Sequence, residues 1–293
     1  MYDKQTNKQT KHIFFACDLN YAPYLITTIK SICYHHQNVQ FYLLNKEIPI
    51  EYFDNLNQKL AQLGSQISDF KLDAEVLQKA KHTHNSLTEA CYYRLLIPEL
   101  LPNVDKALYL DSDTIADGNL DELFALNLDD YLLAAAKDVA LNCGEHWYGE
   151  FPPDMKPYFN SGVLLLNCRK IRETDLVARA VELQQTRYFV YDDQDILNIL
   201  TRNQWLMLDY RYNHQASWEV GVRNRIHDFK RERDLDLAVD MDAIRQEHAA
   251  SPKIIHYINV IKPWRINDVP FRARYWFYHD LEWAEIRAQH ENN

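Results

Sequence analysis

The sequence predicts an α/β fold whose central sheet is mixed but mostly parallel and carries helices on both faces. Short, continuous apolar runs typical of buried strands alternate along the chain with stretches whose apolar residues recur at helical spacing. The composition agrees, because 47% of the 293 residues are hydrophobic and 25% are charged, which is the balance of an ordinary globular protein. This length suits one large α/β domain or two small ones.

The first third of the chain shows the alternation most clearly. Three apolar runs predict strands, because continuous apolar stretches are typical of strands buried on both faces. The two stretches between them place apolar residues on one helical face, and Gly64 suits the end of the second helix. The strands are predicted at residues 12–17, 39–44 and 67–72, and the helices at 21–36 and 50–63.

The rest of the chain continues the pattern with longer irregular parts. Glycines, prolines and aromatic residues gather at residues 142–157 and predict a shaped loop, whereas the charged residues at 222–250 predict a solvated helical segment. A helix is predicted at 88–96, with Pro98 and Pro102 at its exit. Further strands are predicted at 106–110, 132–136, 163–166, 205–208 and 254–258, and a further helix at 196–200.

Composition argues against several kinds of partner and site. The net charge of -10 and the isoelectric point near 5.6 argue against nucleic-acid binding, which needs clustered lysine and arginine. The five cysteines form no Cys-x-x-Cys pair, so neither a zinc site nor a disulfide framework is predicted. The N-terminus shows no secretory signal, and no apolar run approaches the roughly 18 residues of a membrane span. We therefore expect a cytoplasmic protein that touches the inner face of the cytoplasmic membrane only peripherally, if at all.

The strand predicted at residues 106–110 ends on two carboxylates, Asp111 and Asp113. Ligands of open α/β sheets bind just outside the carboxyl ends of strands, where two aspartates could hold a divalent cation beside a diphosphate. The alternative is an ordinary strand that ends in a polar turn. The spacing alone does not decide, because Asp-x-Asp also occurs at residues 193–195, 234–236 and 240–242.

Other polar groups lie at the ends of predicted strands or within them, and strand ends of a parallel sheet converge on one edge. These groups are Asp18, Asn20, Asn160 and His256. By default His256 is a core histidine. Beside two aspartates, however, it would complete a metal site, and an imidazole ligand would favour Mn²⁺ over Mg²⁺.

Two cations are candidates for phosphate binding. Lys262 precedes Pro263 and Trp264, and it is interpreted either as a surface lysine or as a point charge against a phosphate. Arg94 offers the same chemistry, with a helix-surface salt bridge as its alternative. The sequence holds no Gly-x-Gly-x-x-Gly or Walker-type loop, which argues against nicotinamide cofactors and P-loop chemistry.

Five stretches of the chain, in order, resemble glycosyltransferase family 8, which includes glycogenin and retaining galactosyl- and glucosyltransferases of bacterial lipopolysaccharide. The resemblance extends from about residue 12 to about residue 264. The stretches are ACDLNYA at 16–22, YYRL at 92–95, LYLDSD at 108–113, YFNSGVLLLN at 158–167 with DQDILN at 193–198, and HY at 256–257 with KPW at 262–264.

This resemblance implies a GT-A type fold, a single Rossmann-like nucleotide-diphospho-sugar transferase domain at residues 12–265 with a C-terminal helical extension at 266–293. It also implies a UDP-sugar donor and Mn²⁺ or Mg²⁺ as cofactor. The implied site has Asp111, Asp113 and His256 on the metal, Ala16, Asp18, Asn20 and Ser112 on the nucleotide, Lys262 on the diphosphate, Arg94, Asn160, Asp193 and Gln194 around the donor sugar, and Asp138 near donor or acceptor.

The implied reaction is retaining transfer of galactose or glucose to a saccharide acceptor, a lipooligosaccharide or lipopolysaccharide core. A metal and Lys262 would stabilise the charge that develops on the β-phosphate. Gln194 is a poor nucleophile because its amide is neutral. We therefore favour front-face substitution in which the leaving phosphate accepts the acceptor's proton, with Asp193 as a nucleophile as the alternative.

The chain departs from the family pattern at two places. The family usually has a glycine between His256 and Lys262, where this chain has Ile-Asn-Val-Ile at residues 258–261. Some bacterial members of the family end in a basic, aromatic membrane-docking tail, whereas this chain has few basic residues at its C-terminus. Its aromatic and basic residues at 272–277 predict either a short membrane-docking patch or a helix that caps the core.

Two other classes of function compete with sugar transfer. One is a nucleotide-sugar binder without catalysis. The other is a haloacid-dehalogenase-type phosphatase, whose nucleophile loop resembles residues 111–114, although the acidic loop that such enzymes need is not found in the sequence.

Overall fold

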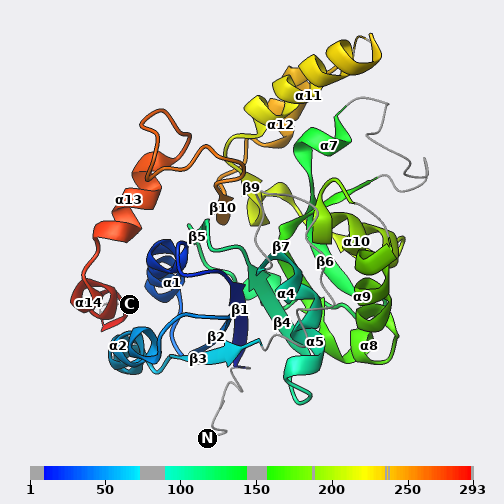
Figure 1. Ribbon diagram of the computed structural model, residues 1–293. Helices are drawn as coiled ribbons and strands as arrows, with labels where there is room; N and C mark the ends of the chain where they lie inside the picture. Colours follow the sequence, from blue (N-terminus) through cyan, green and yellow to red (C-terminus); the bar gives the residue numbers. More distant parts are fainter. Residues whose placement is uncertain are drawn as a thin grey trace, which may run out of the picture.

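A seven-stranded sheet in the order β3-β2-β1-β4-β7-β6-β8 lies at the centre of the computed structural model (Figure 1). The structure describes residues 10–72, 90–143, 157–186, 189–234, 236 and 238–291. Neighbouring strands are parallel except on the two sides of β7, which is antiparallel to β4 and to β6. This confirms the predicted mixed, mostly parallel sheet. The strands are β1 (Lys11–Ala16), β2 (Val39–Asn45), β3 (Gln66–Lys71), β4 (Lys106–Leu110), β6 (Leu133–Lys137), β7 (Phe159–Asn167) and β8 (Trp205–Met207).

Helices cover both faces of this sheet because its strands are apolar on both faces. Ile13 and Phe15 of β1 pack in the core formed with α1, α2 and α14, whereas Phe14 packs in the core formed with α8, α9 and α10. Side chains that alternate along a strand point to opposite faces, so a continuous apolar run fills two cores. The longer helices are α1 (Ala22–His35), α2 (Ile50–Leu60), α9 (Leu176–Thr186), α10 (Asp192–Leu200), α11 (Trp218–Arg233), α12 (Met241–Glu247), α13 (Arg272–Asp280) and α14 (Trp283–Glu291).

Several short helices connect these elements. Gly64 ends the helical segment that follows α2 with a φ of 64°, a left-handed conformation that suits glycine. The predicted helix at 88–96 is split in the structure, and Thr88 lies outside the described residues. The short helices are η1 (Ala61–Leu63), α4 (Ala90–Tyr93), η2 (Arg94–Leu96), α5 (Ile97–Leu100), α6 (Asp121–Phe124), α7 (Val139–Asn142), α8 (Cys168–Arg172) and η4 (Tyr210–Tyr212).

A second, three-stranded sheet lies beside the first and was not predicted as a sheet. It consists of β5 (Thr114–Ala116), β10 (Ile254–His256) and β9 (His214–Gln215), in the order β5-β10-β9. In its register His256 pairs with Thr114. The second sheet therefore places the histidine directly beside the residues that follow β4.

Two predicted elements begin earlier than expected. Asn160 lies inside β7 rather than before it, because the whole segment from Phe159 onward is buried and pairs with β4 and β6. The helix predicted at 196–200 begins at Asp192. Of the loop predicted at 142–157, residues 144–156 lie outside the described residues.

The C-terminal segment packs on the core. α13 and α14 lie against α1 (Figure 1), and Tyr275 and Tyr278 are buried. Asp117 accepts hydrogen bonds from Arg274 Nε at 2.8 Å and from the Tyr278 hydroxyl at 2.7 Å. These contacts favour the core-capping interpretation of residues 272–277 over a membrane-docking patch. None of the helices that the structure describes combines the length and the apolar character needed to cross a bilayer.

Candidate active site

A cavity of about 940 Å³ lies at the carboxyl ends of β1 and β4. The strand order changes direction here, since the chain places β2 and β3 on one side of β1 and β4 on the other. Ligands of open α/β sheets bind at such points. Asn160 also reaches this edge because it stands at the start of β7, which runs in the opposite direction.

Asp111, Asp113 and His256 meet at the floor of this cavity. The two aspartates follow β4 and the histidine ends β10. His256 Nε2 lies 3.6 Å from Asp111 Oδ2 and 3.3 Å from Asp113 Oδ1, and one ligand atom from each residue lies within 4.8 Å of the others. The structure thus brings together the three residues predicted as metal ligands.

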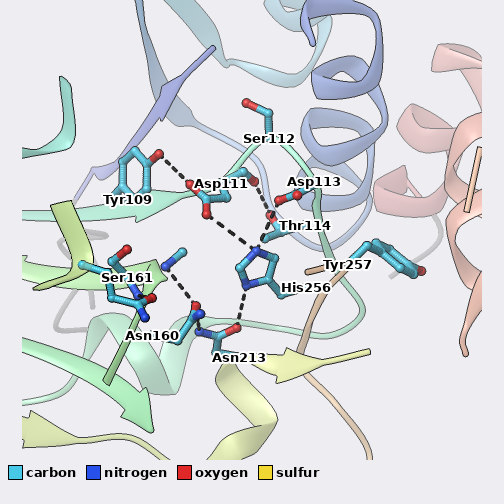
Figure 2. Close-up of polar contacts among 12 residues, drawn as sticks. Tyr109, Asp111, Ser112, Asp113, Thr114, Asn160, Ser161, Asn213, His256 and Tyr257 are labelled. Carbon is cyan, nitrogen blue, oxygen red and sulfur yellow. Dashed lines mark hydrogen bonds and ion pairs between the residues drawn. The ribbon is translucent and has the colours of Figure 1, made fainter. Parts of the chain in front are cut away.

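Asn213 fixes the orientation of the His256 ring (Figure 2). Its Oδ1 lies 3.0 Å from His256 Nδ1, and its amide nitrogen donates to Asn160 Oδ1 at 2.9 Å. Because the Asn213 oxygen can only accept, Nδ1 donates to it, and the other ring nitrogen, Nε2, faces the two carboxylates. Histidine ligands of metals are commonly oriented by such a partner.

The lack of a side chain at Gly162 leaves space for the side chains of Asp111 and His256. A Cβ at this position would collide with the His256 ring, where Nδ1 would be 2.8 Å away, and would lie 2.6 Å from Asp111 Oδ2. The Asp111 backbone N–H also donates to the Gly162 carbonyl at 2.8 Å. Neither Gly162 nor Asn213 was predicted as a site residue. A glycine within a buried strand is a signal of close approach, but the sequence gives no comparable signal for Asn213.

The two carboxylate oxygens of Asp113 have different surroundings. Its Oδ2 forms an ion pair with Lys262, and its buried Oδ1 has no hydrogen-bond partner among the residues that the structure describes. Burial opposes ionisation, but the neighbouring Lys262 and His256 together outweigh it and hold the pKa of Asp113 below its ordinary value. An ionised, buried carboxylate oxygen 3.3 Å from a histidine ring nitrogen is an arrangement that suits a bound cation.

Arg94 links the predicted metal ligands to the donor-sugar residues. Its guanidinium lies 3.0 Å from Asp111 Oδ1 and 3.1 Å from Asp193 Oδ2, and it stacks over the Tyr109 ring at 4.5 Å. It also donates to the Ser161 carbonyl at 2.7 Å. Arg94 is therefore held in a fixed position by β4, β7 and α10 rather than free on a helix surface.

Gln194 and Asp138 form the side of the cavity near β6 and β7. Gln194 accepts a hydrogen bond from Ser161 N at 2.9 Å and donates to Asp138 Oδ2 at 3.3 Å. Asn160 donates to the same Asp138 oxygen at 3.1 Å, while the other oxygen caps α7 through Leu141 N at 3.0 Å. The amides and Asp138 are thus preorganised as one hydrogen-bonded group.

Two predicted site residues do not lie on the cavity wall, which includes Ala16, Asp18, Ser112 and Lys262 among the others. Asn20 is exposed in the turn after β1. Asp193 lies behind Arg94, and burial raises its pKa to about 7. Asp18 also accepts a hydrogen bond from Tyr21 N at 3.0 Å, which shapes the turn that carries it.

Asn259, one of the four residues that stand between Tyr257 and Lys262, adopts a left-handed backbone conformation. Its φ is 62°, in the left-handed region that asparagine tolerates better than most residues other than glycine. The loop from Tyr257 to Lys262 can therefore turn without a glycine, and Ile258, Asn259 and Val260 line the cavity.

Comparisons with known proteins agree with this geometry. The family model described as Glycosyl transferase family 8 matches residues 12–268. The chain is 35% identical over 279 residues to glycosyltransferase GlyB of Streptococcus pneumoniae, which is 94% of this chain and 63% of that protein. It is 27% identical over 263 residues to lipopolysaccharide 1,2-glucosyltransferase of Escherichia coli, which is 86% of this chain and 72% of that protein.

The solved structures show the same fold. The galactosyltransferase LgtC, in complex with donor and acceptor sugar analogs, has a TM-score of 0.73 and 25% identity, covering 95% of this chain and 99% of that one. The chain spans less than two thirds of several streptococcal relatives, between 37% and 64% of their length.

Proposed function

The chain belongs to glycosyltransferase family 8, and we propose that it is a metal-dependent retaining hexosyltransferase that transfers galactose or glucose from a UDP-sugar to a saccharide acceptor. The observation that carries this proposal is the cluster of Asp111, Asp113 and His256 at the cavity floor. Beside the cluster lies Lys262, a cation suited to a diphosphate.

The three residues fit a divalent cation. Two carboxylates and one imidazole form a donor set suited to Mn²⁺. Mg²⁺ would also bind the carboxylates, but it prefers oxygen ligands to an imidazole. Asp113 Oδ1 lies 3.3 Å from His256 Nε2, and one ligand atom from each of the three residues lies within 4.8 Å of the others. When bound, such a cation would neutralise charge on the diphosphate of the donor.

The chain's own residues supply the remaining binding groups. Lys262 would exchange its contact with Asp113 for a phosphate oxygen, and Arg94 would hold Asp111 in place. Asn160, Gln194 and Asp138 would take the hydroxyls of the donor sugar, since amides and carboxylates both pair with hydroxyl groups. Ala16, Asp18 and Ser112 would contact the nucleoside at the end of β1.

Front-face substitution agrees best with the positions of these residues. The bond between the anomeric carbon and the UDP oxygen would break, and a bond to the acceptor hydroxyl would form on the same face. The proton of that hydroxyl would pass to the leaving phosphate. Asp193 is poorly placed as a nucleophile because it lies behind Arg94 at 3.1 Å and not on the cavity wall. Gln194 lines the cavity, but its neutral amide can orient the sugar rather than attack it.

The acceptor that we propose is a lipooligosaccharide or lipopolysaccharide core. Support for it comes from the sequence resemblance and from the name of the Escherichia coli relative. Synthesis of such a core would place the protein in the cytoplasm, in peripheral contact with the inner face of the membrane.

One assay separates the proposed activity from its alternatives. The protein is incubated with Mn²⁺ and a panel of UDP-sugars, with and without lactose as acceptor, and release of UDP is measured. Metal-dependent release of UDP from one donor, with retained configuration in the product, is the expected result. Binding without turnover would indicate a nucleotide-sugar binder, and hydrolysis of phosphate monoesters would indicate a phosphatase. An inverted product would refute the retaining mechanism.

A further inference from the structure

Helix α11 forms one wall of the cavity. Gly221, Asn224, Arg225 and Asp228 line it, and these positions recur every three or four residues, so they form one stripe along the helix. At a rise of about 1.5 Å per residue, the stripe is about 10 Å long. In Figure 1, α11 begins beside β9 and runs away from the central sheet. The stripe therefore leads outward from the proposed reaction centre.

A different stripe of α11 attaches the helix to the protein. Trp218, Val222 and Ile226 pack in one cluster with Val139 of α7 and Ile244 of α12. Gly221 completes this contact, since a Cβ there would lie 3.2 Å from the Cβ of Ala140. Because apolar packing holds the helix, Asn224 and Asp228 are not needed for its attachment.

Asn224 and Asp228 present polar groups that a ligand can reach. Asn224 is exposed and Asp228 is half-buried. Asp228 forms an ion pair with Arg231 at 3.3 Å on the surface of the helix, and exposed pairs of this kind contribute little and exchange readily. The same cavity also presents Tyr191 and Val260, so polar groups and apolar surface are available together, as in sites for small polar ligands.

We propose that Asn224 and Asp228 bind hydroxyl groups of the second sugar of an oligosaccharide acceptor, the one next to the sugar that receives the hexose. This inference rests on the proposed function. The receiving sugar must meet the donor near Gln194 and the predicted metal ligands, so the rest of the acceptor has to leave along a wall of the cavity. An amide and a carboxylate together suit neighbouring hydroxyl groups.

The test compares disaccharides with the monosaccharides that carry the same terminal sugar. The wild-type chain, Asn224→Ala, Asp228→Ala and Asp228→Asn are assayed with the UDP-sugar that supports turnover. The acceptors are lactose with methyl β-galactoside and cellobiose with methyl β-glucoside. Arg223→Ala is the matched control, because Arg223 is an exposed neighbour on the same helix and does not line the cavity. Release of UDP without acceptor reports on the donor site and on folding.

We expect wild-type protein to prefer the disaccharide and each alanine variant to lower kcat/KM for the disaccharide about tenfold, as for one lost hydrogen bond. The monosaccharide reaction, the acceptor-free release of UDP and the Arg223→Ala control should be unchanged. Three results would overturn the inference if acceptor-free UDP release persists. They are equal losses for the disaccharide and the monosaccharide, no loss in either alanine variant, and a wild-type chain that shows no preference for the disaccharide. Absence of UDP release from every donor would instead overturn the proposed function, and this inference with it.

Discussion

Substitution of Gly162 by alanine gives the most direct test of the proposed metal site. The added methyl group would lie 2.6 Å from Asp111 Oδ2 and 2.8 Å from His256 Nδ1, well inside the contact distance of these atoms. Neither neighbour can yield easily, because Asp111 is bonded to Arg94 and Tyr109 and His256 is bonded to Asn213. The methyl group would therefore push two of the three predicted ligands out of position.

The size of the effect follows from the cost of overpacking. An extra methyl group in a well-packed site costs about 1–3 kcal/mol of strain. If this strain must be overcome before the three ligands can meet the ion, the affinity for Mn²⁺ falls about 5- to 150-fold. Gly162 does not have a positive φ, so alanine meets no backbone penalty there. We expect Gly162→Ala to fold and to bind Mn²⁺ more weakly by this factor, measured by isothermal titration calorimetry.

Gly118→Ala is the matched control for this experiment. A Cβ at Gly118 would meet the Lys253 side chain, with the nearest atom at 2.7 Å, and a flexible lysine chain can move aside. Its Mn²⁺ affinity should equal that of the wild type, and circular dichroism should show both variants folded. If Gly162→Ala bound Mn²⁺ as tightly as the wild type, the ion would not sit between Asp111 and His256.

Three further predictions concern neighbouring groups. Asp113→Asn should abolish metal-dependent UDP release without changing the circular dichroism spectrum, because a neutral amide replaces an ionised ligand; near-wild-type activity would place the site elsewhere. Asn213→Leu should weaken Mn²⁺ binding about 10- to 100-fold by leaving the His256 ring unoriented, whereas Asn213→Asp, which keeps an accepting oxygen, should lose less. Burial lowers the pKa of His36 from 6.5 to about 4, so the folded state binds fewer protons than the unfolded state between these values, and stability should fall as pH drops from about 6.5 to about 4. His36→Gln, which can still accept from Leu120 N, should flatten part of that fall in urea titrations; an unchanged slope would contradict it.

The alternation of strands and helices was predictable from the sequence because each element has its own apolar period. The direction of β7 was not. Its apolar run is buried on both faces, and a buried antiparallel strand shows the same continuous run as a parallel one. The strand predicted at 254–258 contains β10, but the small sheet could not be predicted. Its other strands, β5 and β9, contain only three and two residues, and such strands carry no measurable period.

The site was predicted to the extent that its residues have local signals. Asp111, Asp113 and His256 each follow or end an apolar run, and the structure places them together. Asn213 has no such signal, because its role depends on His256, which lies 43 positions away along the chain. At Asn259 the structure adds what the sequence pattern could not show. The sequence shows only that the glycine is absent, whereas the structure shows that Asn259 adopts a positive φ, which asparagine tolerates.

The balance of charge at the site explains why an acidic chain would need a cation to bind a diphosphate. Three carboxylates, Asp111, Asp113 and Asp193, are paired with Arg94 and Lys262. Asp138 also lines the cavity, as do Arg225 and Arg265. Arg94 is already paired with two of these carboxylates and Lys262 with a third, so neither cation carries charge in excess of its partners. Burial raises the pKa of Asp193 to about 7 against the opposing charge of Arg94, and Asp111 contributes to the rise. A UDP-sugar would add negative charge to this group in a chain whose net charge is already -10. We therefore expect a divalent cation at Asp111 and Asp113 to offset this charge and to release Lys262 for the phosphate, as the proposed function requires.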